Sequence, residues 1–78
     1  MRVITELMIN ETFSVVGDEE ETSEGTEIGD LESMGHEVVS DPASSWTLRV
    51  QGDTVIVGSR NILAVRFHVV DEAASSDQ

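Results

Sequence analysis

Carboxylates are the side chains most able to do chemistry in this sequence, and more than half of them lie in one stretch. Nine of the sixteen acidic residues fall within residues 18–37. Placing like charges this close together costs folding free energy, so we expect either a function that uses the charges or a medium such as concentrated salt that screens their repulsion. Carboxylates at a spacing near that of phosphates can occupy a basic groove that otherwise holds DNA or RNA, because counterions are released on the partner's side.

The sequence therefore predicts a nucleic-acid-mimicking face for contact with a basic protein. The residues expected to carry this contact are Glu19, Glu20, Glu21, Glu24, Glu27, Asp30 and Glu32. Two alternatives stay open. Runs of charge are usually solvated faces or loops, and a chain with many carboxylates, eleven valines and no lysine is also typical of a proteome adapted to molar salt.

The same stretch fits neither a metal site nor an active site. A calcium loop needs oxygen ligands at alternating positions around a central glycine, a pattern that the order D-E-E-E-T-S-E-G lacks. The chain has no lysine, cysteine or tyrosine and no phosphate-binding glycine loop, and nothing marks one pair among its sixteen acids for acid–base work. We expect no metal, no cofactor and no enzymatic activity.

Charge and composition exclude further classes. The net charge is −12 and all four basic residues are arginine, so direct binding of nucleic acid is excluded. Without cysteine there are no disulfides, thiolate zinc sites or cysteine nucleophiles. No apolar run approaches the roughly 18 residues of a membrane span, and no signal-peptide core follows Met1-Arg2. We expect a cytoplasmic protein without membrane contact, in the host cytoplasm if it is viral.

The few cationic and aromatic side chains have structural interpretations. Arg49, Arg66 and His68 are expected on one outward face of a sheet, either as a contact face or, more commonly, paired with carboxylates of the same chain. His36 is expected beside a helix C-terminus, which favours a cationic side chain. Trp46 is expected in the core, the alternative being an anchor at the rim of an interface.

Alternating apolar residues predict strands in the second half of the chain. Residues 46–50 alternate, Gly52-Asp53 predicts a two-residue turn, and residues 54–57 continue as a second strand. The turn sets Leu48 opposite Val57, so the apolar residues of both strands share one face.

A second turn at residues 58–61 leads into a long strand at residues 62–70, which completes a three-stranded meander. Its expected inward residues are Leu63, Val65, Phe67 and Val69. Its outward face also carries apolar residues, which suits a second buried face. These are Ile62, Ala64 and Val70.

The first half of the chain opens with a strand predicted over residues 2–9, with Val3, Leu7 and Ile9 inward. A short helix over residues 3–8 is the alternative. A turn at residues 10–11 then leads into a strand at residues 12–16.

In the middle of the chain, Thr26 is expected to cap a short helix. The apolar face of that helix would be Ile28, Leu31 and Met34. Gly35 is expected to end the helix as a left-handed residue, and residues 36–39 to form a strand that Asp41-Pro42 ends.

The expected fold is α+β: a small, mostly antiparallel sheet or a partly open barrel of five to six strands with one short helix. Eleven valines and five isoleucines against four leucines favour this pleated structure. Residues 1–70 form the single domain, with an acidic segment at residues 17–35, and residues 71–78 form a flexible acidic tail.

Two resemblances accompany this interpretation. The stretch TVIVGSRNILAVRF, about 14 of the 78 residues, resembles the last strands of Sm-like small barrels. It implies barrel-like topology and no function, because the earlier glycine- and aspartate-containing motif and the basic RNA-binding loops of those barrels are missing. In size, acidity and lack of catalytic residues the chain also resembles the small inhibitors of phages and mobile elements, which block nucleic-acid-binding enzymes such as restriction and CRISPR complexes.

We therefore expect a non-enzymatic module that docks an acidic, nucleic-acid-mimicking face onto a basic, nucleic-acid-binding protein and inhibits it. The alternative is a small structural or assembly protein of a halophilic host or its virus. In that case the acids serve solubility and the sheet forms a homo-oligomer.

Overall fold

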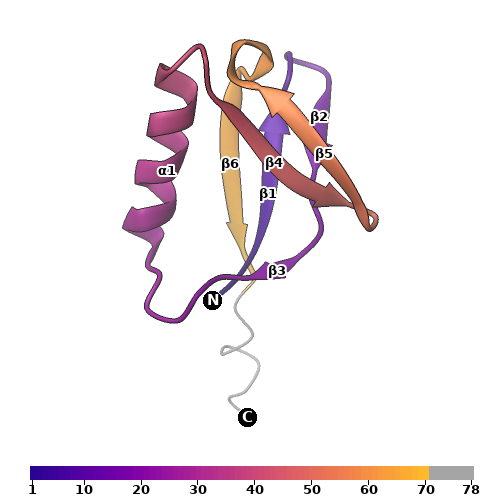
Figure 1. Ribbon diagram of the computed structural model, residues 1–78. Coiled ribbons are helices and arrows are strands. Elements are labelled where there is room, and N and C mark those ends of the chain that lie inside the picture. The colour runs from indigo at the N-terminus through magenta and orange to yellow at the C-terminus, as the bar shows by residue number, and fades with distance from the viewer. Residues whose placement is uncertain (71–78) are drawn as a thin grey trace.

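The computed structural model describes residues 1–70, which form one α-helix and six strands in two antiparallel sheets (Figure 1). The elements are β1 (Arg2–Met8), β2 (Ser14–Val16), β3 (Glu20–Glu21), α1 (Ile28–Ser40), β4 (Ser45–Val50), β5 (Asp53–Gly58), a 3₁₀ turn (Ser59–Asn61) and β6 (Ala64–Val69). The predicted α+β class is confirmed, and the described strands close no barrel. The predicted acidic tail, residues 71–78, lies outside the described residues.

β1 is the central strand of the larger sheet. β6 pairs with it from Val3 opposite Val69 to Met8 opposite Ala64. β2 and β3 pair with the two ends of β1, and because a strand has only two edges, both lie on the side away from β6. The strand predicted for the start of the chain is confirmed, and the alternative helix over residues 3–8 is not formed. Val3 and Leu7 are buried as expected.

Residues 17–18, between β2 and β3, join the two sheets. The N–H of Gly17 still donates to the carbonyl oxygen of Thr5 in β1 at 2.8 Å, whereas the N–H of Asp18 donates to the carbonyl oxygen of Arg49 in β4 at 2.7 Å. The carboxylate of Asp18 accepts two backbone N–H groups of the β4–β5 turn, at 2.8 and 3.0 Å. These three hydrogen bonds of Asp18 join the hairpin of β4 and β5 to the larger sheet.

β4 and β5 form the predicted hairpin, but the turn predicted at Gly52-Asp53 is wrong. Gln51-Gly52 makes the turn, with φ of 53° and 86°, which is the left-handed pair that a type I′ turn requires. Leu48 consequently lies opposite Val55 rather than Val57. A shift of two residues leaves every side chain on its predicted face, so the apolar face of the hairpin is as expected.

The predicted three-stranded meander is wrong, because β6 pairs with β1 and not with β5. The 3₁₀ turn carries the chain from one sheet to the other, and the Ser59 hydroxyl fastens it to α1 by donating to the carbonyl oxygen of Val38 at 2.7 Å. Ile62, predicted outward, is buried in the core at 8% exposure. A long-range pairing with β1 has therefore replaced the local pairing that the sequence favours.

The inward set predicted for this strand is half right. Val65 and Phe67 are half-buried, whereas Leu63 and Val69 are exposed at 60% and 41%. Leu63 lies before the strand begins, where its N–H donates to the carbonyl oxygen of Met8 at 2.7 Å.

α1 runs through the glycine that is predicted to end it. The strand predicted at residues 36–39 is therefore wrong, and Glu27 rather than Thr26 is the N-cap residue. Gly35 does not adopt a left-handed conformation. A Cβ at this position would make an ordinary contact of 3.6 Å with the Phe67 ring, so α1 packs against β6 here without requiring a glycine.

The buried stripe of α1 also differs from the predicted face. Leu31 is buried and Val38 half-buried, whereas Ile28 and Met34 are exposed. His36 is exposed in the middle of the helix and not beside its C-terminus, so that prediction is wrong as well.

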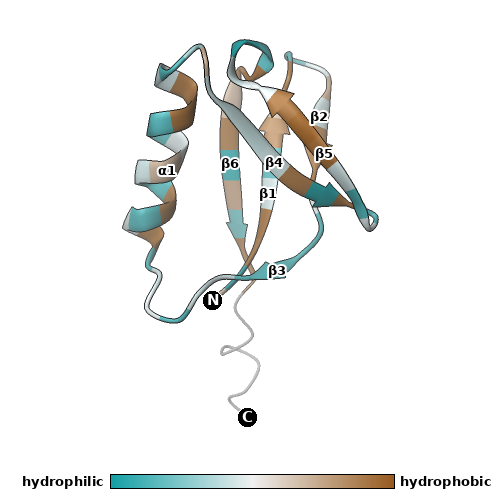
Figure 2. Ribbon diagram, in the orientation of Figure 1, coloured by the Kyte–Doolittle hydropathy of each residue, from teal (hydrophilic) through white to brown (hydrophobic). Residues whose placement is uncertain are grey.

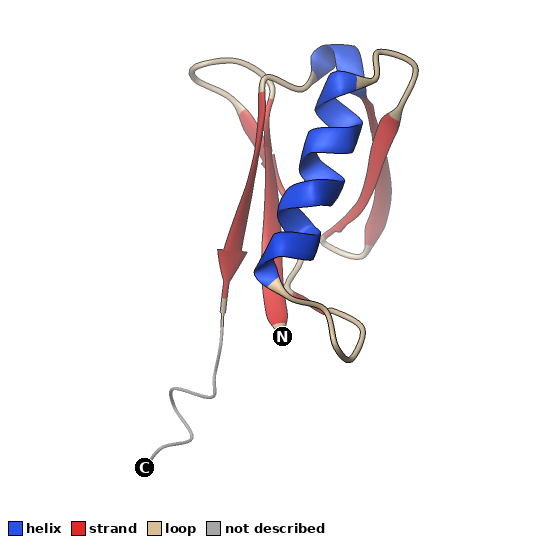
Figure 3. Ribbon diagram, turned by 90° about the vertical axis from the view of Figure 1, so that its left-hand side faces the viewer, coloured by secondary structure: helices blue, strands red, loops and turns tan. Residues whose placement is uncertain are grey.

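The core lies between the hairpin and the larger sheet, with Leu7, Leu48 and Ile62 at its centre. Figure 2 shows apolar residues concentrated on β1 and β5 and alternating with polar ones along α1. Trp46 packs against this core as predicted, and its ring lies 5.7 Å from that of Phe67 at an angle of 51°. α1 contacts β6 and the 3₁₀ turn and runs alongside the strands (Figure 3).

Candidate functional site

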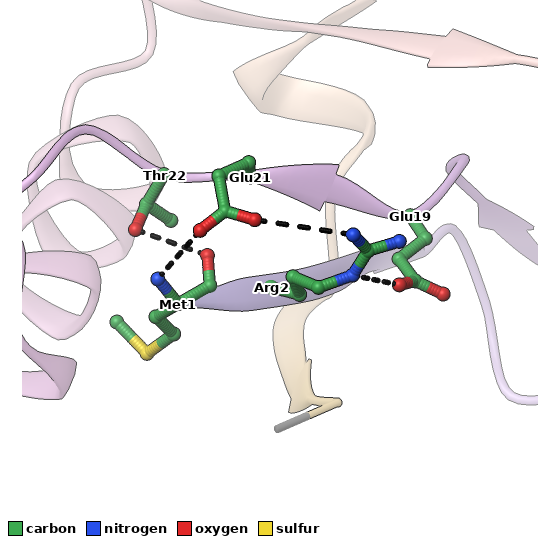
Figure 4. Close-up of polar contacts among 5 residues, drawn as sticks. All are labelled: Met1, Arg2, Glu19, Glu21 and Thr22. Atoms are coloured by element: carbon green, nitrogen blue, oxygen red, sulfur yellow. Dashed lines mark hydrogen bonds and ion pairs between the residues drawn. The ribbon is translucent and has the colours of Figure 1, made fainter. Parts of the chain in front are cut away.

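Two of the seven predicted contact residues are paired within the chain. The Arg2 Nε donates to Glu19 Oε2, and the Arg2 Nη1 lies 4.0 Å from Glu21 Oε1 (Figure 4). Glu21 Oε2 also accepts the amino group of Met1 at 3.1 Å, and the Thr22 hydroxyl donates to the Met1 carbonyl at 3.1 Å. These contacts hold β3 against the start of β1, so Glu19 and Glu21 have a structural role.

Two others, Glu27 and Asp30, belong to the start of α1. Asp30 Oδ2 accepts the backbone N–H of Glu27 at 2.8 Å. This satisfies a donor just before the helix, and carboxylates near a helix N-terminus are favoured by the helix dipole. The negative charge at this end of α1 is therefore compatible with folding.

The remaining three, Glu20, Glu24 and Glu32, are exposed and form no ion pair within residues 1–70. Because side chains alternate along a strand, Glu20 points away from the face that Glu19 and Glu21 share with Arg2. The seven residues therefore do not form one cluster but lie around β3 and the start of α1. Of the seven, only Glu20, Glu24 and Glu32 make neither an ion pair nor a helix-start contact within the described residues.

The acidic residues of the whole domain are segregated along the chain. Residues 1–41 contain twelve acids and one arginine, whereas residues 42–70 contain three arginines and the single acid Asp53. This division follows the chain and not the surface, because β6 pairs with β1 from end to end and its Arg66 lies 3.8 Å from Glu6. The acids are most concentrated in residues 18–37, which hold nine acids and no arginine and are called the acidic part below.

An open groove of about 480 Å³ lies beside the acidic segment, between α1 and β4. Six of its apolar lining residues are buried or half-buried: Val3, Leu31, Val38, Trp46, Leu48 and Phe67. The exposed Met34 also lines it. Its acidic lining residues are Asp18, Glu20, Glu21 and Glu37, of which Glu21 is paired with Met1 and Arg2, and no arginine or histidine of the described chain lines it.

Asp18 is a groove residue that the sequence analysis does not single out. The N–H groups of Gly52 and Gln51, followed by the more distant charge of Arg49, hold the pKa of its carboxyl below the usual value. It therefore stays ionised through the physiological range. The groove itself also escapes the sequence analysis, because its helical wall depends on α1 continuing past Gly35.

The second polar cluster centres on Glu6. Glu6 Oε1 lies 2.9 Å from His68 Nε2 and 3.8 Å from Arg66 Nη1, and Glu6 Oε2 accepts the Ser14 hydroxyl at 2.7 Å. The hydrogen bonds from His68 and then Ser14 lower the pKa of Glu6. Because the carboxylate lies between the serine and the histidine, this order does not activate a nucleophile.

This cluster confirms that Arg66 and His68 pair with a carboxylate of the same chain. The prediction that Arg49 shares their face is wrong, since Arg49 belongs to β4 in the other sheet. Its guanidinium donates to the carbonyl oxygen of Gly52 at 2.8 Å.

No protein family, curated protein or solved structure matches this chain. Within residues 1–70, no three histidine or carboxylate side chains gather where they could ligate a metal ion. The helix found in this part of the chain is too short and too polar to span a bilayer.

Proposed function

We propose that this protein is a non-enzymatic binding module that docks its acidic part onto a basic, nucleic-acid-binding protein and inhibits it by occupying the surface that nucleic acid would use. The observation that carries the proposal is the concentration of charge in residues 18–37, which hold nine acids and no arginine. A protein whose acids serve only solubility in salt has no reason to concentrate more than half of them in twenty residues.

Three exposed carboxylates, Glu20, Glu24 and Glu32, are the strongest contact residues, because no ion pair in the described chain neutralises them. Glu19 and Glu21 add to the field around β3 even though Arg2 lies between them. A basic partner would be steered toward this part of the molecule.

A displacement experiment with charge-matched variants tests the proposal. Protamine, an arginine-rich DNA-binding protein, is loaded with a fluorescent DNA duplex, and the release of the duplex is followed by anisotropy as this protein is added. The test variant is Glu20→Gln/Glu24→Gln and the control is Glu11→Gln/Asp53→Asn. Both raise the net charge equally, and all four residues are exposed.

The wild type and the control should displace the duplex at similar concentrations. The test variant should need about three- to tenfold more protein, since exposed ion pairs contribute about 0.2–1 kcal/mol each. Equal loss in both variants would show that only net charge matters, and absence of displacement by the wild type would refute the proposal outright.

The alternative, a homo-oligomer formed through the sheet, has one supporting observation. β5 pairs only with β4 within the described residues, and its Ile56 is 67% exposed. An open strand edge without lysine or proline is a template for pairing with a second copy. A solution mass that stays monomeric at high protein concentration would exclude this alternative.

A further inference from the structure

The groove between α1 and β4 combines two kinds of lining that call for different chemistry in a ligand. Trp46 and Phe67 present a tilted aromatic pair, and Val3 and Leu31 extend the apolar surface. Its volume of about 480 Å³ falls in the usual range of ligand pockets, about 300–1,000 Å³. This part of the groove favours an apolar group.

The carboxylates of the groove set the charge of the ligand. Asp18, Glu20, Glu21 and Glu37 come from three places: the segment between β2 and β3, β3 itself, and α1. No cationic side chain of the described residues lines the groove with them. Asp18 and Glu21 already have partners within the chain, but an uncharged occupant would desolvate Glu20 and Glu37, which form no ion pair in the described residues, and this is unfavourable.

A small hydrophilic cation would neutralise the carboxylates but would leave the apolar lining exposed to water. Arginine beside an apolar side chain satisfies both requirements. Its planar guanidinium stacks on aromatic rings and donates two parallel hydrogen bonds to a carboxylate, whereas lysine offers a point charge.

We propose that this groove binds a short segment of the basic partner in which arginine side chains alternate with apolar ones. The proposal rests on the proposed function, since the segment belongs to the same partner. It adds that recognition depends on apolar anchoring in the groove as well as on charge.

Trp46 provides the measurement, because it is the only tryptophan of the chain and lines the groove. Its fluorescence is recorded while a hexapeptide of alternating arginine and leucine is added. One control peptide has serine in place of leucine, and the other has citrulline, the neutral analogue, in place of arginine. The first peptide should give a saturable change, and each control should bind at least about tenfold more weakly.

A pair of helix variants locates the binding. Met34→Arg places a cation in the groove, and Val39→Arg adds the same charge to the same helix outside it, at similar exposure (47% and 42%). Met34→Arg should weaken peptide binding at least about tenfold, and Val39→Arg by no more than about threefold. If Met34→Arg does not fold by circular dichroism, Glu37→Gln takes its place and Glu11→Gln, the same charge change outside the groove, becomes its control, with about a threefold loss expected for the first and no loss for the second.

The outcomes separate the two proposals. Equal binding of the three peptides, or equal loss in the two variants, would overturn the groove site. If the wild type still displaces DNA from protamine in that case, the proposed function stands on surface charge alone. If it does not, the proposed function fails independently of the groove.

Discussion

Gly17 is the residue on which the joining of the two sheets depends most directly. A Cβ at this position would lie 3.0 Å from Leu48 Cδ1 and 3.3 Å from the carbonyl oxygens of both Arg49 and Thr5. Those two oxygens accept the N–H groups of Asp18 and Gly17 themselves. The backbone therefore cannot move away from an added methyl group without lengthening the hydrogen bonds that fasten the hairpin.

Gly17→Ala should lower the free energy of unfolding by about 1–3 kcal/mol, the usual effect of adding a methylene group to a filled space. For a domain of this size, each kcal/mol corresponds to roughly 4–8 °C in Tm. Urea and thermal unfolding followed by Trp46 fluorescence measure both quantities, since that side chain is half-buried against the core.

Gly29→Ala is the matched control, because nothing lies within 4 Å of a Cβ there and the residue is in the first turn of α1. It should leave stability unchanged or raise it by up to about 1 kcal/mol. A Gly17→Ala variant as stable as the wild type would show that residues 17–18 do not pass between the sheets as described.

Two further predictions concern the helix and the hairpin turn. Gly35→Ala should raise the free energy of unfolding, measured in urea titrations, by up to about 1 kcal/mol. Alanine has a higher helix propensity than glycine, and its Cβ would make an ordinary 3.6 Å contact with Phe67. A clear decrease in the free energy of unfolding would indicate that the helix ends at this residue. Asp18→Asn should lower the unfolding midpoint at neutral pH, since the N–H groups of Gly52 and Gln51 favour the carboxylate and lower its pKa. That contribution to stability is present above the unfolded-state pKa near 3.8 and is lost as the pH falls through the lower folded-state value. The unfolding midpoints of the wild type and the variant should therefore converge in acid. A difference that stays constant down to that pH range would contradict the role given to Asp18.

The sequence predicts the local parts of this fold and misses the long-range ones. The β4–β5 hairpin is predicted because alternation and a glycine turn lie within twelve residues of each other, and the error of one residue in the turn preserves the faces. The pairing of β6 with β1 is missed because the two strands are more than fifty residues apart, and the apolar pattern of β6 fits either neighbour equally well.

The helix shows how a tertiary contact overrides a local signal. Gly35 followed by His36 is typical of a helix end, but α1 continues to Ser40 and packs at Gly35 against Phe67, a residue on a distant strand. The spacing of Leu31, Gly35 and Val38 at four and three residues is the signal that could have extended the helix.

The sequence shows where the acidic residues are concentrated, but it does not show which of them form ion pairs or helix-start contacts within the fold. That Glu19 and Glu21 hold Arg2, and that Asp30 accepts a backbone N–H before α1, depends on where β3 and the helix begin. The groove needs α1, β1 and β4 placed together, and no local pattern specifies that arrangement.

The central claim is that the carboxylates form a binding surface and do not serve tolerance of salt, and folding as a function of potassium chloride tests it most directly. Between about 0.01 M and 1 M salt the screening length falls from about 30 Å to about 3 Å, so repulsion among the acids is progressively removed. Circular dichroism and Trp46 fluorescence should show a folded protein already at the lowest concentration, with little change up to 1 M. A chain that folds only as the salt approaches molar concentrations would contradict the claim, because its charge would then be an adaptation to a saline host.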